Sequence, residues 1–426
     1  MWTAVLVFIA TLILGVPVAF SLGSATVVYL YLKGVSLGLI AQRMFTGLDS
    51  FPFMAIPFFI LAGDLMNTSG ITKKLVNFAN VIVGHIKGGL GHVNIVSCMF
   101  FAGITGSAIA DASAVGSMLI PAMEEEGFDL DFSAGLTASA AIVGPIIPPS
   151  IPFVIYSLLS STSVAALFMA GMIPGILVGI SLMIVTYILA VKRNYPYTKQ
   201  KPTFQEIVKA TVQGIIPLLM PVIILGGILA GVFTATEASG VAVVYALFIG
   251  FFVYKNLDWK TVKHILINTG KTTGTVFLII ACSNIFNWAL VVEQVPQQMA
   301  TFVAHIFTNR VILLLAINIV LLIVGTFMEG TAAMIILVPI LLKIVEGYGI
   351  HPVMLGAIVV LNLMIGLLTP PVGLVLYTVC GITHISLERL TKAVLPFLIV
   401  EIGILFLVTY VEPISMFLPR FFGYVK

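Results

Sequence analysis

The chain has 426 residues, of which 60% are hydrophobic and 9% are charged. Soluble domains carry about 25% charged residues, and disordered chains combine low hydrophobicity with high charge, so this composition excludes both classes. A net charge of +3 without a basic tract argues against nucleic-acid binding. Continuous apolar runs argue against a transmembrane β-barrel, whose strands alternate apolar and polar residues. The composition therefore predicts an all-α, polytopic membrane protein in a lipid bilayer.

Long apolar runs predict the spanning helices, because about 20 apolar residues cross a bilayer. The first run, residues 1–32, holds no charged residue before the end of a full span. It lacks the basic start and the clear cleavage site of a secretory signal, so it predicts one retained first helix. Further spans are predicted near residues 50–66, 133–162, 163–191, 212–232, 238–254, 272–292, 353–379 and 391–412.

Shorter apolar stretches occur in two pairs, each interrupted by glycine, threonine and an acid. Half-length segments of this kind predict re-entrant hairpins, since broken backbone at membrane depth is tolerated only where it is buried in protein or lines a cavity. The hairpins are predicted at about 88–125 and 308–346. Each is followed by a run with a Pro-Pro pair, which predicts a broken helix at about 131–162 and 351–379.

Three segments of the first half match segments of the second half in the same order, which predicts an internal repeat. The matches are DASAVGSMLIP at 111–121 with EGTAAMIILVP at 329–339, GPIIPP at 144–149 with GLLTPP at 366–371, and GVPVAFSLGSATVVY at 15–29 with GVFTATEASGVAVVY at 231–245. The predicted division is a first repeat at 1–195, a linker at 196–209 and a second repeat at 210–426.

The linker region also predicts the orientation in the membrane. Residues 192–209 hold five basic residues and one acid, and the positive-inside rule places such a loop in the cytoplasm. About five crossings and one hairpin in each half would invert the second repeat relative to the first. Both chain termini are then predicted on the outer side.

The hairpins carry the first group of candidate site residues. Hydroxyl and carbonyl oxygens at a glycine-rich turn are suitable ligands for a small cation, and Thr105 and Ser107 lie at such a turn. Asp111 and Glu329 are intramembrane acids, which mark functional sites by default. They could attract a cation, orient a hairpin turn or pair with a basic group. The alternative for the small residues is a helix-packing seam.

The Pro-Pro pairs carry the second group. Two consecutive prolines remove two backbone donors and disfavour helical geometry in the preceding residue, so a helix must break at residues 144–149 and 366–371. The freed carbonyls can bind ions, and the N-terminus of the following half-helix favours an anion. The alternative is a simple proline kink. No nucleotide-binding loop, HExxH or GxSxG sequence occurs, so no enzyme is predicted.

At these residues the chain resembles a known family. GSAIADASAVGSMLIPAM at 106–123 and GPIIPPSIPFVIY at 144–156 are similar to the large membrane subunit of tripartite ATP-independent periplasmic (TRAP) transporters, DctM/SiaM type. The resemblance covers essentially the whole chain. It implies a sodium-coupled importer of the bacterial inner membrane, in which two inverted repeats each give a hairpin and a broken helix to a mobile, elevator-type transport domain.

The resemblance also implies the ligands, with Na⁺ as coupling ion at two or more sites. Sodium site 1 would comprise Thr105, Ser107, Gly144, Ile147 and Pro149. Sodium site 2 would comprise Gly325, Thr326, Gly366 and Thr369. The substrate would lie near Asp111, Ser113, Glu329 and Thr331.

Two partners are implied by the same family: a small membrane subunit of the DctQ/SiaQ type and a periplasmic substrate-binding protein of the DctP/SiaP type. The sequence starts directly with the first large-subunit helix, so the small subunit is expected as a separate chain. The expected substrate is an organic acid, either sialic acid or a C4-dicarboxylate. The alternatives are a stand-alone sodium/dicarboxylate symporter of the related elevator superfamily and, from a different class, an ion channel.

Overall fold

Helices make up the regular structure of residues 2–197 and 202–425, which a computed structural model of the chain describes, and these ranges contain no strand. Seven helical segments within them are long and apolar enough to cross a membrane. They are α4 with its preceding turn (Phe51–Thr68), α10 (Val164–Arg193), α11 (Phe204–Leu229), α12 with a following π turn (Ala235–Val253), α13 (Trp259–Val292), α15 (Arg310–Phe327) and α19 (Leu387–Tyr410). The predicted polytopic all-α class is confirmed.

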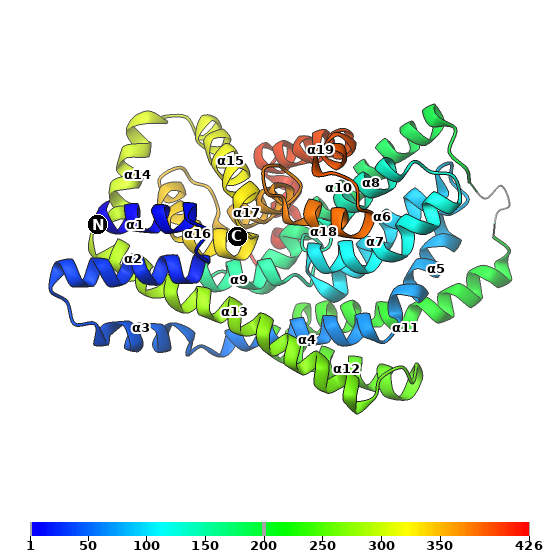
Figure 1. Cartoon of the computed structure of the whole chain (residues 1–426), viewed down its shortest axis with the longest axis horizontal. Helices are drawn as coiled ribbons and strands as arrows, with labels where there is room; N and C mark the ends of the chain where they lie inside the picture. Colours follow the sequence, from blue (N-terminus) through cyan, green and yellow to red (C-terminus); the bar gives the residue numbers. More distant parts are fainter. Residues whose placement is uncertain (1, 198–201, 426) are drawn as a thin grey trace.

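The start of the chain differs from its prediction. Residues 1–32 do not form one spanning helix, because α1 (Trp2–Ile13) ends before α2 (Val18–Lys33) begins, and the two helices pack side by side (Figure 1). Gly15 adopts a positive φ of 80°, and Pro17 has no N–H to continue the helical hydrogen bonds. The prediction of a single first span is therefore wrong. The amphipathic helix α3 (Gly38–Leu48) then leads to α4.

Two helix–turn–helix pairs lie where the hairpins were predicted, and their re-entrant course in the membrane stays a prediction. The first pairs α6 (Gly89–Thr105) with α7 (Ala108–Glu125), and its turn at residues 106–107 is called tip 1. The second pairs α15 with α16 (Gly330–Glu346), and its turn at residues 328–329 is called tip 2. Each helix after tip 1 or tip 2 continues through an internal proline.

Both predicted helix breaks are present as well. The chain leaves helical geometry between α8 (Leu130–Ala141) and α9 (Ile151–Ser160), and again between α17 (Pro352–Gly366) and α18 (Leu374–Thr383). Residues 142–150 are called break 1, and residues 367–373 are called break 2. The Pro-Pro peptide bond in each break is cis. The inverted relation between the two halves stays a prediction.

The predicted linker at 196–209 is shorter than expected. Helix α11 begins at Phe204, because the Thr203 hydroxyl and the Glu206 carboxylate cap its first turn reciprocally. Of the basic residues predicted for this loop, Lys199 and Lys201 lie outside the described residues. The remaining helices are α5 (Ile71–Val83), α14 (Val295–Ile306) and α20 (Pro413–Phe421).

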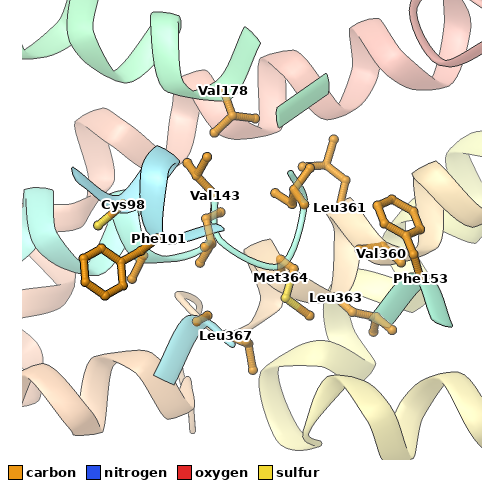
Figure 2. Packing of buried hydrophobic residues seen from close by; sticks show 14 of the residues in the cluster. Cys98, Phe101, Val143, Phe153, Val178, Val360, Leu361, Leu363, Met364 and Leu367 are labelled. Carbon is orange, nitrogen blue, oxygen red and sulfur yellow. The ribbon is translucent and has the colours of Figure 1, made fainter. Parts of the chain in front are cut away.

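The buried core lies around the two broken helices. Every residue of α17 after its first is buried, and so is every residue of α8 from Phe132 onward. Figure 2 shows Val143 of break 1, Val178 of α10 and Leu361 of α17 within this packing. Large apolar side chains are exposed on the outer helices, as expected for surfaces that face lipid. The core therefore encloses break 1, whereas Pro370 and Pro371 of break 2 are exposed.

Candidate functional site

Tip 1 packs directly on the end of break 1. Gly106 adopts a φ of 59°, and a Cβ added there would lie 3.1 Å from the backbone nitrogen of Ile151. Only glycine combines this backbone conformation with so close an approach. Ser107 then caps α7, because its hydroxyl accepts a hydrogen bond from the N–H of Ala110. Thr105 and Ser107 therefore flank a turn that contacts the break.

Asp111 lies in the first turn of α7 and is completely buried. Its Oδ1 accepts a hydrogen bond from the Thr105 hydroxyl, and its Oδ2 has no hydrogen-bond partner among the described residues. A Cβ on Gly144 would lie 1.9 Å from Oδ2, so the carboxylate faces the start of break 1. The α7 N-terminus favours the negative charge at this position. The structure thus joins Asp111 with Thr105 and Gly144, which were predicted for sodium site 1.

Break 1 presents carbonyl oxygens that other backbone groups do not use. In the described chain, no backbone N–H donates to the carbonyls of Gly144, Ile147 or Pro149. The Ser150 hydroxyl closes the turn by donating to the Pro145 carbonyl at 2.5 Å. Carbonyl oxygens are the ligands that hard cations prefer. The residues predicted for sodium site 1 therefore include suitable oxygen atoms beside tip 1 and along break 1.

The end of α15, just before tip 2, contacts break 2 through the backbone. The Thr326 carbonyl accepts hydrogen bonds from the N–H groups of Val372 and Gly373 at 3.2 and 3.3 Å. A Cβ on Gly366 would lie 2.6 Å from the Cα of Gly325, so the helices approach too closely for any side chain. The Thr369 hydroxyl donates to the Ile365 carbonyl at 3.1 Å. The structure thus brings Gly325 against Gly366 and Thr326 against break 2, which also contains Thr369.

The four predicted substrate residues do not share one environment. Asp111 is buried against break 1, whereas Ser113 is exposed on the same helix. Glu329 is exposed and caps α16, with its carboxylate accepting from the N–H of Ala332 at 3.1 Å. Thr331 is buried in the first turn of α16. No hydrogen bond or ion pair joins any two of them in the described structure.

The equivalence of Asp111 with Glu329 in the repeat is also not kept. Glu329 occupies the cap position of its hairpin, which Ser107 occupies in the first hairpin. The two cap residues are 222 positions apart, which is the offset of the two breaks and not the offset of 218 that paired Asp111 with Glu329. The two halves therefore differ in chemistry near their tips. The carboxylate that follows tip 1 is buried, whereas the carboxylate in tip 2 is exposed.

Two polar features of the core were not predicted. Asn94 of α6 donates to Thr137 of α8 at 2.6 Å. In the second half, Asn362 of α17 donates to Asn318 of α15 at 2.6 Å, and Asn318 donates to Thr409 of α19 at 3.0 Å. Buried amides at matching places in both hairpins could have been found as polar residues inside apolar segments. Each amide fixes the first arm of a hairpin to the first segment of a broken helix.

Glu401 of α19 is the second unpredicted feature. Its side chain is completely buried, and neither carboxylate oxygen has a hydrogen-bond partner in the described chain. The signal in the sequence is an acid in the middle of the span predicted at 391–412.

The surface cavities lie away from the breaks. One cavity of about 700 Å³ is bounded by α4, α12 and α13 and is lined by apolar side chains such as Leu61, Phe251 and Trp259. A polar cavity of about 690 Å³ lies on α4 and α13 and includes Asp64. Neither contains a predicted site residue, and the apolar one faces the surroundings rather than the core. The described residues also contain no group of three acidic, histidine or cysteine side chains that could hold a metal ion.

An all-helical membrane chain in which hairpin tips meet helix breaks has the architecture of a membrane transporter. The fold is similar to that of the Alcanivorax borkumensis YdaH transporter, with a TM-score of 0.59, 13% sequence identity and 88% of each chain covered. At this identity the comparison shows a shared fold.

Comparison of sequences gives the family. Residues 5–414 match the family described as tripartite ATP-independent periplasmic transporter, DctM component. The chain is 43% identical over 419 residues to the sialic acid TRAP transporter large permease protein SiaM of Vibrio cholerae, with 98% of each covered. It is 41% identical over 384 residues to the C4-dicarboxylate TRAP transporter large permease protein DctM of Pseudomonas aeruginosa, with 90% of each covered. The chain belongs to the DctM family of TRAP transporter large permeases.

Proposed function

We propose that the chain is the membrane permease of a sodium-coupled, binding-protein-dependent importer that moves an organic acid by an elevator movement. The observation that carries the proposal is the meeting of Asp111 and break 1. A buried carboxylate oxygen faces Gly144, beside carbonyls that accept no backbone hydrogen bond. A cation bound there would compensate the buried charge, which is otherwise costly.

Sodium site 1 is proposed at tip 1 and break 1. The Thr105 and Ser107 hydroxyls and the carbonyls of Gly144, Ile147 and Pro149 would supply oxygen ligands, and Asp111 would supply the attracting charge. A hard monovalent cation suits an all-oxygen site of this kind. Asp111 thereby takes the cation-attracting role and not the substrate-binding role that the family resemblance implied.

Sodium site 2 is proposed at tip 2 and break 2. Thr326 and Thr369 donate their hydroxyl protons to the carbonyls of Ile323 and Ile365 at 2.7 and 3.1 Å. Each hydroxyl oxygen keeps lone pairs that can face a cation. The contact between Gly325 and Gly366 sets the separation of the two helices that provide these groups.

The substrate is proposed to bind between the two tips, near Ser113, Glu329 and Thr331. Helices α7, α9, α16 and α18 begin at the tips and breaks, and helix N-termini favour anions. Bound sodium would offset the cost of closing a carboxylate into a site of low dielectric. Sodium and substrate would then raise each other's apparent affinity by the same factor.

The proposed substrate is sialic acid or a C4-dicarboxylate, since the similar permeases from V. cholerae and P. aeruginosa carry these names. The proposed partners are a separate small membrane subunit and a periplasmic substrate-binding protein. The proposed location is the bacterial inner membrane, with both termini periplasmic and the loop at 192–209 cytoplasmic.

Uptake into proteoliposomes tests the proposal. The chain and its small subunit would be reconstituted, and labelled sialic acid or succinate supplied with an inward sodium gradient and no ATP. Uptake that requires both the sodium gradient and a binding protein supports the proposal. Uptake that requires sodium alone would instead support a stand-alone symporter. Flux that does not saturate and follows only the substrate gradient would indicate a channel.

A further inference from the structure

Glu401 lies in the middle of α19 and is completely buried, with both carboxylate oxygens lacking a hydrogen-bond partner in the described chain. An ionised carboxylate in such surroundings costs far more than a neutral one, unless a cation or several donors compensate it. The groups that the neighbouring helices place near Glu401 determine whether a cation, hydrogen-bond donors or a proton can neutralise its carboxylate.

Helix α8 fixes the depth of Glu401 on one side. Arg389 pairs with Asp131 at 2.6 Å, and a Cβ on Gly135 would lie 2.8 Å from the backbone of Ala393. Both contacts join residues 258 positions apart, so α8 and α19 run parallel in a constant register. Glu401 is therefore level with Val143, the second residue of break 1.

Helix α17 fixes the depth on the other side. Arg310 contacts Met354 near the start of α17 at 3.7 Å and Glu412 beyond the end of α19 at 3.4 Å, so these two helices run antiparallel. Glu401 lies eleven residues before Glu412, which is about 16 Å along a helix. The same rise from Met354 along α17 ends at Ile365, next to break 2. Glu401 thus lies at the depth where both broken helices end.

No basic group on the helices packed against α19 reaches this depth. These helices are α8, α10, α17, α18 and α20, together with α15, whose Asn318 donates to Thr409 of α19. Their titratable residues are Asp131 on α8, Tyr187, Lys192 and Arg193 on α10, Arg310 at the start of α15, Tyr377 and Cys380 on α18 and Arg420 on α20, with none on α17. Arg310 pairs with Glu412, beyond the end of α19. Arg193 and Arg420 form ion pairs at helix ends with Asp129 and Glu412.

Helix α19 itself also provides no basic group that could compensate a charge on Glu401. Lys392 is the closest basic residue along α19, nine residues or about 13 Å away, and it pairs with Glu388 at 2.7 Å. A hard cation needs several oxygen ligands, and the only polar side chain along α17 is Asn362, so α17 does not supply such a set.

We propose that Glu401 is a proton-binding site at the centre of the permease. Its carboxyl group holds a proton while α19 is packed between the ends of α8 and α17. The proton is released when the core opens and water reaches the side chain. This site is separate from the two proposed sodium sites and does not depend on them.

The proposal predicts a pH dependence with a definite sign. An unfolded chain releases the Glu401 proton near pH 4.3, the ordinary value for glutamate, whereas the folded chain keeps it. The folded state then binds one proton more than the unfolded state. The folding constant therefore falls about tenfold for each pH unit above that value, until the folded protein also loses the proton.

Infrared spectroscopy of the purified permease in lipid at pH 7 gives a direct test. The spectrum of wild type minus E401Q should contain the C=O stretching band of a protonated carboxylic acid. The matched variant E388Q, an exposed glutamate of the same helix, should leave that band in place. A difference spectrum with only carboxylate bands would overturn the proposal.

Unfolding between pH 6 and 9 gives a second test that does not require transport. The folding constant of wild type and of E388Q should fall more steeply with pH than that of E401Q, by about tenfold per unit. Equal slopes in all three proteins would overturn the proposal. If E401Q does not fold, the absolute infrared spectrum of a D111N and D64N double variant should still contain the band of a protonated carboxylic acid, and its absence there would overturn the proposal.

Discussion

Gly144 and Asp111 meet at the start of break 1 without room for a methyl group, since a Cβ on Gly144 would lie 1.9 Å from Oδ2 of Asp111. The carboxylate cannot move aside freely, because it is buried and accepts a hydrogen bond from Thr105. A glycine and an acid from distant parts of the chain are thereby fitted to each other. Replacing Gly144 with alanine, which adds a single methyl group, tests whether this close contact is required.

Gly144→Ala should reduce sodium-dependent uptake by at least about tenfold, because overpacking a core typically costs about 1–3 kcal/mol. The rate of uptake at several sodium concentrations measures the effect. Gly226→Ala on α11 is the matched control, since nothing lies within 4 Å of a Cβ added there. Wild-type uptake by Gly144→Ala would show that the site tolerates displacement of Asp111.

Gly366→Ala should impair both stability and sodium dependence, because its Cβ would lie 2.6 Å from the Cα of Gly325. Backbone cannot rotate away as a side chain does, so we expect a loss of about 1–3 kcal/mol. Thermal unfolding and sodium titration of uptake would measure the two effects. Gly381→Ala on α18, where the added Cβ meets nothing within 4 Å, should behave as wild type.

Asp111→Asn should weaken apparent sodium affinity while preserving the shape of the side chain. A unit charge 4 Å from a cation contributes about 4 kcal/mol at an effective dielectric of 20, so a loss of at least about tenfold is expected. Ser117→Ala, an exposed position further along the same helix, is the control. An unchanged sodium titration in Asp111→Asn would remove Asp111 from the cation site.

Asp129 should make stability depend on acid pH. The Tyr195 hydroxyl, which donates to Oδ2 at 2.5 Å, and then the Arg193 guanidinium lower the pKa of this carboxyl below its usual range. Because the folded pKa is lowered, the stabilisation is present above about pH 4 and is lost as pH falls through the folded pKa. The cluster lies at the aqueous end of α8 and α10.

Asp129→Asn should therefore lower the unfolding temperature at pH 7 and flatten its decline in acid. The expected loss is below about 1 kcal/mol, because Arg193 and Asp129 are 45% and 59% exposed. Glu125→Gln, an exposed acid at the end of α7, should leave the profile unchanged. A wild-type acid profile in Asp129→Asn would contradict the assignment.

The breaks could be predicted because proline acts locally. Two prolines interrupt helical hydrogen bonding wherever they occur, so Pro148–Pro149 and Pro370–Pro371 place both breaks within a few residues of their observed positions. The same logic applied to Gly15 and Pro17 would have divided the first helix. There the surrounding apolar run was long enough for a full span and concealed the turn.

The chemistry around the breaks could be predicted only in part. Alignment of the two halves paired Asp111 with Glu329, but one is a buried first-turn residue and the other an exposed cap. That difference depends on how each tip contacts its break, which residue spacing does not specify. Glu401 was missed for a similar reason: its isolation depends on the register of α19 with α8 and α17.

The buried amide contacts from Asn94 to Thr137 and from Asn362 to Asn318 give each hairpin and its broken helix one stiff frame. In the proposed elevator movement, such a frame would travel without internal rearrangement, and the displacement would occur at its boundary. Gly103 of α6 lies on that boundary, where an added Cβ would come within 2.5 Å of Pro221 of α11. Because Gly103 has no side chain, α6 has no protruding group at this point that would interlock with the Pro221 ring of α11. The distance between spectroscopic labels on α6 and α8 should stay constant during transport. The distance between labels on α6 and α11 should change each time the frame moves.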